Sequence, residues 1–410
     1  MGIVAKHLGR NVQPVPEQPV AMAERLEPVW QALEQHNVAA LYGMGGIGKT
    51  TLANAVFNQL QRDYVNCCCY VEIGPMSMDA PVRAPLIEVK QRQMLKDLCG
   101  LTASARGVKQ NMTMLQERLR NAQVLLVLDD VWSRDQLECL LVETSPGSRV
   151  LVTSRNRGLL QEHLPRLCNG RYALVQVDLL SQSDSRRMLN LHAFGRPEAI
   201  SHLATEAEEV ADTCSCLPIT LRVTGSFLAQ HQSAQMWQGV CYRLRQAQPV
   251  NGQLNDDDIF ASLRVSYTYL HPTMQTMLMD IACVLLGQPE SAVSFAWGSD
   301  GLLGLENLKN LSLITVNGMG TLVMHDQVRD MLQSHASNHS NDKHASMYAW
   351  GAYASEVLRQ PLHLMKVSNL RVSLTLPRYT VHEQECGILV SCACSWPNKC
   401  QVKSHRLDLC

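Results

Sequence analysis

Apolar residues follow two different patterns in the first half of this chain. Short, mostly apolar runs occur at 38–42, 67–73, 124–128 and 148–155. Between them, apolar residues recur every three or four positions, most clearly at 52–60 and 86–98. The runs are typical of buried parallel strands, and the recurrence is typical of amphipathic helices. We therefore predict an α/β domain with a parallel sheet in this half.

The second half of the chain has a different pattern. Beyond residue 178 the strand-like runs give way to helical spacing, at 183–192, 204–213, 259–267 and 273–286. A hairpin is predicted at 313–324, because Asn317-Gly318 separates two short apolar segments and favours a tight turn. We expect a helical bundle domain followed by a winged-helix domain, since helices followed by a hairpin are typical of that module.

Length and charge narrow the possible functions. The chain has 410 residues, enough for two or three domains, and a net charge of −1 from 36 basic and 37 acidic residues. This balance gives no general attraction for nucleic acids or acidic membranes. The sequence has no apolar run of membrane-spanning length and no signal-peptide pattern at its start. We therefore expect a cytoplasmic protein that does not associate with membranes.

The chain contains fifteen cysteines, and five of them lie close to its end. These five are Cys386, Cys392, Cys394, Cys400 and Cys410. They lack paired C-x-x-C spacing, so an unstructured tail is favoured over a zinc site. Most of the others lie singly or in apolar runs and are interpreted as small buried side chains.

A phosphate-binding loop is predicted at 43–51, where the sequence GMGGIGKTT matches G-x-x-x-x-G-K-[ST]. It lies between a strand-like run and a helical pattern, as the motif requires. The loop glycines let backbone N–H groups turn toward an anion, and the helix dipole adds positive potential. We expect Lys49 to bind the β- and γ-phosphates and Thr50 to bind Mg²⁺. The remaining predicted nucleotide-binding residues of the loop are Gly43, Gly45, Gly46, Gly48 and Thr51.

A second motif follows the run at 124–128, where LLVLDDVW places two carboxylates at the end of a predicted buried strand. Ligands bind at this end of parallel sheets. We expect Asp129 to hold Mg²⁺ and Asp130 to orient or deprotonate the attacking water. Taken alone, the pattern also fits a buried strand followed by an acidic turn. The phosphate-binding loop upstream favours the catalytic interpretation.

Arg155 ends the predicted strand at 148–155. An arginine at the end of a strand near phosphates can sense the γ-phosphate through charge-assisted hydrogen bonds. A surface salt bridge is the alternative, and for the residue in isolation the two are equally favoured.

In this order the motifs resemble the nucleotide-binding domain of plant disease-resistance proteins, the NB-ARC or NLR-type branch of STAND P-loop ATPases, which animal apoptosis scaffold ATPases share. The resemblance covers roughly residues 20–332. It rests on GMGGIGKTTLA, LLVLDDVW, GSRVLVTSR, LPITLRVTGSFL, LRVSYTYL with MDIAC, and MHD. Some of these motifs resemble the coiled-coil type of receptor and others the TIR type, so the subclass stays open.

The resemblance implies further roles. Arg155 matches the family's sensor arginine, Pro218 the proline that packs near adenine, and His325 the histidine that contacts the β-phosphate of ADP. In the family, bound ADP holds a closed off-state, ATP opens it into a signalling oligomer, and slow hydrolysis resets it. By itself, His325 would be a surface histidine and Asp326 an ordinary N-cap of a helix from Gln327. The resemblance instead implies that the triplet Met324-His325-Asp326 is a latch between the winged-helix domain and the nucleotide.

The resemblance also assigns domain boundaries. Residues 1–20 are a proline-containing lead-in, 21–178 the P-loop domain, 179–255 an ARC1-like helical domain, 256–332 an ARC2-like winged-helix domain, and 333–410 a linker with the cysteine-containing tail. About 42 residues precede the loop, too few for a TIR domain or coiled-coil bundle, and residues 331–410 show no leucine-rich repeat period. We expect the family's sensor and effector to be missing, which leaves a truncated gene product or a stand-alone switch.

The leading function is therefore an ADP/ATP switch in plant defence with weak ATPase activity at most, whose partners are immune receptors or further copies of itself. A plain ATPase or nucleotide kinase is the first alternative, but residues 74–123 lack the clustered arginines of a kinase lid. A winged-helix transcription regulator is the second. The acidic run at 256–258 and the absence of a basic recognition helix make nucleic acid an unlikely partner.

Overall fold

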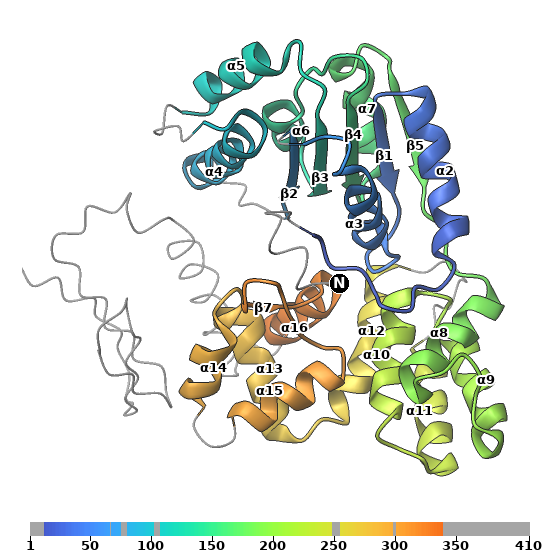
Figure 1. Cartoon of the computed structure of the whole chain (residues 1–410). Helices are drawn as coiled ribbons and strands as arrows, with labels where there is room; N and C mark the ends of the chain where they lie inside the picture. The colour runs from blue at the N-terminus through green and yellow to red at the C-terminus, as the bar shows by residue number, and fades with distance from the viewer. Residues whose placement is uncertain are drawn as a thin grey trace, which may run out of the picture.

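A computed structural model describes residues 12–65, 67–74, 80–101, 107–247, 255–297 and 301–338. The cysteines of the tail, and with them the zinc alternative, lie outside the described residues. The described part has an α/β region and a helical region packed against each other (Figure 1). None of its helices combines the length and the apolar character needed to cross a membrane.

The α/β region is built on a parallel sheet of five strands. The strands are β1 (Val38–Tyr42), β2 (Cys68–Glu72), β3 (Leu125–Val131), β4 (Arg149–Ser154) and β5 (Tyr172–Gln176), in the order β2-β3-β4-β1-β5. The predicted parallel sheet is thereby confirmed. The sequence patterns did not single out β5, because this edge strand is only partly buried and lacks a long apolar run.

Helices cover both faces of the sheet. One face packs against α2 (Met22–Gln35) and α3 (Lys49–Leu60). The other shares a core with α4 (Ala80–Cys99), α5 (Val108–Leu119), α6 (Arg134–Leu140) and α7 (Arg157–Leu167). Alternate residues of β1 enter the two cores, with Leu41 on the α3 side and Ala40 on the other. This two-sided burial explains the continuous apolar runs in the sequence.

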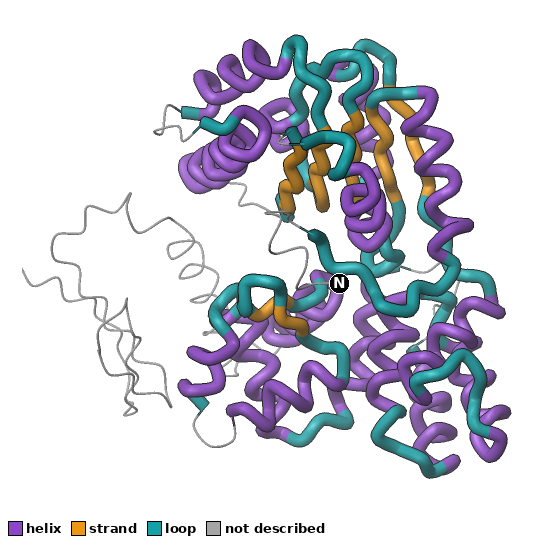
Figure 2. Tube along the Cα trace, in the orientation of Figure 1, coloured by secondary structure: helices purple, strands orange, loops and turns teal. Residues whose placement is uncertain are grey.

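The helical region follows β5. Its first part comprises α8 (Gln182–Phe194), a 3₁₀ turn (Ser201–Leu203), α9 (Ala204–Thr213), α10 (Pro218–Leu228) and α11 (Ala234–Gln246). Its second part comprises α12 (Asp256–Thr268), α13 (Pro272–Asp280), a π-helical turn (Ile281–Leu285), α14 (Glu290–Ala296), α15 (Gly301–Asn310) and α16 (Asp326–Asn338). Figure 2 shows that the strands of this region are confined to one small hairpin.

The predicted hairpin is present but shorter than expected. Strands β6 (Thr315–Val316) and β7 (Leu322–Val323) pair antiparallel over two residues each. The side-chain oxygen of Asn317 accepts hydrogen bonds from the backbone N–H groups of Met319 and Thr321, at 3.0 and 3.1 Å. The asparagine thus stabilises the turn, and the chain after β7 leads directly to α16.

The described part of the lead-in, from residue 12 on, contacts α3. The backbone N–H of Gln13 donates to Asn58 Oδ1 (2.8 Å), and Asn58 Nδ2 donates to the Gln13 carbonyl (2.7 Å). Asn54 Nδ2 donates to the carbonyl of Pro14 (2.9 Å). These contacts hold an extended segment without regular secondary structure, as the prolines predict.

Candidate functional site

The predicted phosphate-binding loop connects β1 to α3 and has the backbone geometry of its motif. Gly43, Gly46 and Gly48 have φ angles of 156°, 75° and 103°, values that favour glycine over other residues. A Cβ on Gly43 would lie 2.9 Å from the carbonyl oxygen of Val177, which leaves no room for a side chain. The glycines of the motif are therefore required by the path of the chain.

Lys49 begins α3 and is almost fully buried. Its ammonium group donates to the carbonyls of Gly43 and Met44, both at 2.8 Å. Burial, followed by the charge of Arg155, lowers the pKa of Lys49 to about 8, and nearby carboxylates such as that of Asp130 only partly oppose this. A buried ammonium held mainly by neutral carbonyls would be stabilised by an anion within the loop.

Thr50 and Asp129 meet although 79 positions separate them. Thr50 Oγ1 donates to Asp129 Oδ1 (3.2 Å), and Thr153 Oγ1 donates to the same oxygen (2.6 Å). Asp129 is buried, which raises the pKa of its carboxyl, while the hydrogen bonds from Thr153 and Thr50 oppose that rise. Thr51 follows in the first turn of α3 and is partly buried.

Asp130 lies at an irregularity of β3. Its φ of 59° is unusual for a residue other than glycine, and the register with β4 shifts between Leu128 and Val131. The carboxylate accepts a hydrogen bond from Trp132 Nε1 at 2.7 Å. Burial, then the negative charge of Asp326, raises the pKa of Asp130 to about 6. This backbone shift separates the two adjacent carboxylates into different environments.

Arg155 connects the end of the sheet to α16. Its guanidinium lies 3.9 Å from Asp130, 3.7 Å from Asp326 and 3.2 Å from Asp330. It also lies over the ring of Trp132, 4.7 Å from the centroid. The surface salt bridge considered from the sequence is therefore a partly buried contact between the α/β region and the helical region.

The start of α10 packs on the phosphate-binding loop. Pro218 occupies the first turn of this helix, as predicted, and is buried. The backbone N–H of the next residue, Ile219, donates to the carbonyl of Gly46 (3.3 Å). A Cβ on Gly46 would lie 2.3 Å from Ile219 Cγ2, so helix and loop are in close contact.

The start of α16 contacts the other side of the loop. Gln327 is fully buried, and its Nε2 lies 1.5 Å from the place that a Cβ on Gly45 would take. The amide donates weakly to Asp256 (3.5 Å), whereas Gln327 Oε1 has no hydrogen-bond partner among the described residues. Sequence reasoning missed Gln327, because a contact across nearly 300 positions leaves no local signal.

His325 immediately precedes α16, and its ring caps the helix. Nδ1 accepts a hydrogen bond from the backbone N–H of Gln327 (3.1 Å), and the His325 carbonyl accepts from Val328 and Arg329 (both 3.0 Å). The N-cap considered for Asp326 is thus wrong, because the helix already begins at Asp326. With Nδ1 an acceptor, the neutral ring carries its proton on Nε2.

His325 is exposed to solvent although protein surrounds it on most sides. Desolvation by these surroundings and the positive charges of Arg222, Arg155 and Lys49 lower its pKa to about 4, while Asp326 opposes the shift. His325 is therefore neutral at pH 7 and lies within the electrostatic reach of the predicted phosphate site.

Arg25 of α2 is a second site residue that the sequence did not reveal. One of its terminal nitrogens donates to the carbonyls of Ile47 (2.6 Å) and Asp178 (3.1 Å). It therefore ties the phosphate-binding loop to the segment that joins β5 to α8. Burial lowers the pKa of Arg25, and the negative charges of Asp178 and Asp184 oppose this effect.

These residues fit a nucleotide and a magnesium ion. The loop has a glycine cradle and a buried lysine whose charge is only partly compensated. The hydroxyl of Thr50 and the carboxylate of Asp129 are the oxygen ligands that Mg²⁺ prefers. Every residue predicted for the site lies around this loop: the glycines, Lys49 to Thr51, the two aspartates, Arg155, Pro218 and His325.

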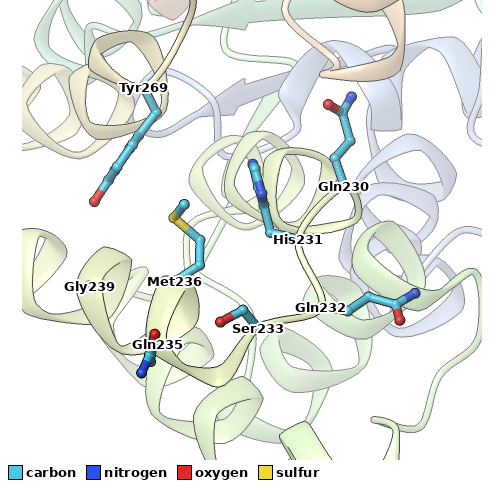
Figure 3. A pocket seen from close by; sticks show the side chains of 8 residues that line it. All are labelled: Gln230, His231, Gln232, Ser233, Gln235, Met236, Gly239 and Tyr269. Carbon is cyan, nitrogen blue, oxygen red and sulfur yellow. The ribbon is translucent and has the colours of Figure 1, made fainter.

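An open hollow in the described part lies away from the phosphate-binding loop. It has a volume of about 490 Å³ and lies between α10, α11 and α12 (Figure 3). Its lining is mostly uncharged and includes Gln230, His231, Ser233 and Tyr269. It contains no carboxylate or lysine, so the chemistry of the loop carries the assignment of the site.

Comparison with known proteins adds independent findings. Residues 22–198 match the model of the NB-ARC domain. The chain is 30% identical over 327 residues to disease resistance protein RML1B of Arabidopsis thaliana, a match covering 76% of this chain and 30% of that protein. It is 27% identical over 308 residues to TMV resistance protein N of Nicotiana glutinosa, covering 72% and 25%. The chain thus spans between a quarter and a third of these relatives' length.

A solved structure shares the fold. It is a signal transduction ATPase with numerous domains, a STAND protein with a tetratricopeptide repeat sensor, from Pyrococcus horikoshii. The similarity has a TM-score of 0.52 and 16% sequence identity, and covers 87% of this chain and 49% of that one. At this identity it supports the α/β P-loop fold and no finer property.

Proposed function

Because residues 22–198 belong to the NB-ARC domain family of plant disease resistance proteins, we propose that this chain is a nucleotide-dependent switch in plant immune signalling. In this proposal ADP holds the off-state, ATP holds the on-state, and slow hydrolysis of ATP resets the switch. The observation that carries it is the convergence of α10 and α16 on the phosphate-binding loop, at Gly46 and Gly45. Two helices from the helical region thereby lie where they can respond to the phosphates.

The proposed roles follow from the geometry of the side chains. Lys49 binds the β- and γ-phosphates, and Thr50 with Asp129 would hold Mg²⁺, which neutralises phosphate charge when bound. Asp130 orients or deprotonates the attacking water. Its carboxylate is held by Trp132 and faces Arg155, so it is oriented before any substrate arrives.

The same proposal explains how the triphosphate opens the protein. Arg155 has its positive charge between Asp130 of the sheet and Asp326 and Asp330 of α16. A γ-phosphate near the end of β4 competes with these carboxylates for the guanidinium. When Arg155 binds the γ-phosphate in place of these carboxylates, the ion pairs that attach α16 to the sheet weaken. The helical region then moves away from the loop.

We further propose that residues 179–255 and 256–332 act as separate helical and winged-helix units in this movement. Their partners in the opened state are further copies of the chain or other immune receptors inside the cell. In the roles that the family resemblance implies, Pro218 packs near adenine and His325 contacts the β-phosphate. Both residues flank the loop, which supports these roles.

The nucleotide content of the purified protein tests the proposal. We expect extraction and chromatography to release ADP, and Lys49→Ala to lose it. Lys109→Ala is the matched control, because this exposed lysine belongs to α5, which packs on the face of the sheet opposite to α3. If Lys49→Ala retains as much nucleotide as the control, the proposed phosphate site is wrong.

A further inference from the structure

One partly buried arginine near the loop has no anionic partner among the described residues. Arg222, in α10, forms no ion pair there, and its Nε has no hydrogen-bond partner. Burial lowers its pKa, and no described carboxylate counters that effect. A guanidinium that is partly removed from water, with its buried Nε unpartnered, is costly, so this residue calls for an explanation.

The position of Arg222 on α10 places it beside the nucleotide site. It follows Ile219 by three residues, so the two side chains lie on the same face of the helix. Ile219 contacts Gly46 of the phosphate-binding loop through its backbone N–H and its side chain. Side chains in a helix lean toward its N-terminus, which for α10 is the end that meets the loop.

Arg222 also acts electrostatically on the residue that precedes α16. Its charge contributes to lowering the pKa of His325, as do the charges of Lys49 and Arg155. It contributes in the same way at His192 of α8. Arg222, Arg155 and Lys49, from three separate elements, thus act electrostatically on His325, which precedes α16.

The other basic groups of this cluster already have partners. Arg155 faces three carboxylates, and Lys49 donates to two backbone carbonyls. His325 is neutral and accepts a hydrogen bond from Gln327. Arg222 is the member of the cluster whose charge is uncompensated within the described residues.

We propose that Arg222 is an additional phosphate-binding residue of this site, which reads the phosphate groups of the bound nucleotide from the helical region. The inference rests on the nucleotide-binding function proposed above. Its chemistry is that of a guanidinium donating charge-assisted hydrogen bonds to phosphate oxygens. Because Arg222 belongs to α10, the phosphates would hold this helix against the loop, which couples nucleotide binding to the position of the helical region.

If Arg222 binds phosphate, two results are expected that would not be seen if its role were purely structural. Replacing Arg222 leaves the nucleotide-free protein at least as stable, since an uncompensated charge is removed. The same change weakens the binding of phosphate-bearing ligands, and leaves the binding of adenosine, which lacks phosphate, unaltered. Lysine at this position retains part of the affinity, because it keeps the charge and loses the planar donor set.

The experiment measures ADP and adenosine affinity and the melting temperature, with and without ADP, for the full chain. The variants are Arg222→Gln, Arg222→Lys and Lys49→Ala. Arg264→Gln is the matched control, because Arg264 of α12 is also partly buried with an unpartnered Nε but lies in a surface groove beside α11.

We expect Arg222→Gln to bind ADP about 10- to 100-fold more weakly than wild type, and to lose most of the ADP-induced rise in melting temperature. Arg222→Lys should lie between the two, and Arg264→Gln should match wild type. Wild-type ADP affinity in Arg222→Gln, with Lys49→Ala impaired, overturns the inference and leaves the proposed function standing. An equal loss of adenosine and ADP binding assigns Arg222 a structural role and also overturns it. If Lys49→Ala binds ADP normally, the nucleotide site itself is misassigned.

Discussion

Arg155, the residue after β4, lies 3.2 Å from Asp330 of α16, which follows it by 175 positions. Arg155 and Asp330 have side-chain exposures of 16% and 22%, so solvent screens the pair only in part. Asp326, on the same helix, is 3.7 Å from the same guanidinium. The two carboxylates of α16 therefore attach the helical region to the sheet through one arginine.

The first prediction concerns Asp330. Changing it to asparagine removes one charge from this contact and should speed ADP release. A partly exposed ion pair contributes about 0.5–1 kcal/mol, which corresponds to roughly two- to fivefold. Stopped-flow release of a fluorescent ADP analogue measures the rate. Asp257→Asn is the control, since this exposed residue of α12 forms no ion pair with any residue that the structure describes. Identical release rates in both variants would mean that Asp330 does not hold the closed form.

The second prediction concerns Gly45 and Gln327. Gly45 does not have a positive φ, so alanine is compatible with its backbone, and the obstacle to a Cβ is the buried Gln327 amide. Gly45→Ala should displace the start of α16, at a cost of about 1–3 kcal/mol, and accelerate ADP release. Shortening the neighbour in Gly45→Ala/Gln327→Ala should restore much of the wild-type rate.

Thermal melting and ADP release of the two single variants and the double variant measure this coupling. Gly239→Ala of α11 is the control, because a Cβ there would be 3.7 Å from the nearest atom outside its helix. If the double variant releases ADP as fast as Gly45→Ala alone, the alanine acts on the phosphates directly and not through α16.

The sequence alone predicted those parts of the fold and of the site whose signals are local in the chain. The strands β1, β3 and β4 were predicted because burial on both faces leaves runs such as Val124–Leu128. Lys49, Thr50 and Asp129 were predicted because the spacing of each motif is local, and the ends of parallel strands meet at one edge of the sheet. The structure brings these residues together as expected.

The residues that the sequence did not reveal share a different property. Arg25, Gln327 and Asp330 reach the site from α2 and α16, and their roles depend on how separate elements dock. Docking between elements leaves no spacing that can be recognised along the chain. Asp130 is an intermediate case, since the motif predicted its role, whereas its φ of 59° and its bond to Trp132 required the structure.

The third prediction concerns hydrolysis. Asp130→Asn removes the carboxylate that orients the water and should leave ATP bound but uncleaved, with turnover reduced about 10²- to 10⁴-fold. Chromatography of bound nucleotide after a single-turnover incubation measures both quantities. Asp63→Asn is the control, as this exposed residue follows α3 at a distance from the loop. Unchanged cleavage in Asp130→Asn would remove Asp130 from the reaction. Wild-type turnover near the ~10 s⁻¹ of metabolic enzymes would favour a plain ATPase over a switch.

The last prediction concerns the latch at His325 and Asp326. The neutral ring of His325 carries its proton on Nε2, because Nδ1 accepts from Gln327, and can donate it to a phosphate oxygen. Asp326 holds Arg329 at 3.0 Å and Arg155 at 3.7 Å, so it ties the start of α16 to the sheet. A charge-assisted hydrogen bond from His325 to a phosphate contributes about 1.5–3 kcal/mol, so losing it shifts a balanced two-state equilibrium about 10- to 100-fold toward the open form. The ion pairs of Asp326 are partly exposed, like that of Asp330, and contribute about 0.5–1 kcal/mol each.

We therefore expect His325→Ala and Asp326→Val to lower ADP retention and to raise the fraction of purified protein that carries ATP. Extraction of bound nucleotide and the ADP release rate measure both effects. His202→Ala is the control for the histidine, since this residue is exposed and belongs to the 3₁₀ turn between α8 and α9. The two contacts act on different partners, so His325→Ala should lose the direct phosphate contact, whereas Asp326→Val should also free Arg155 for the γ-phosphate and favour ATP more strongly. Wild-type release rates in both variants would place the latch elsewhere, with Asp330 and Gln327 as the remaining contacts between α16 and the site.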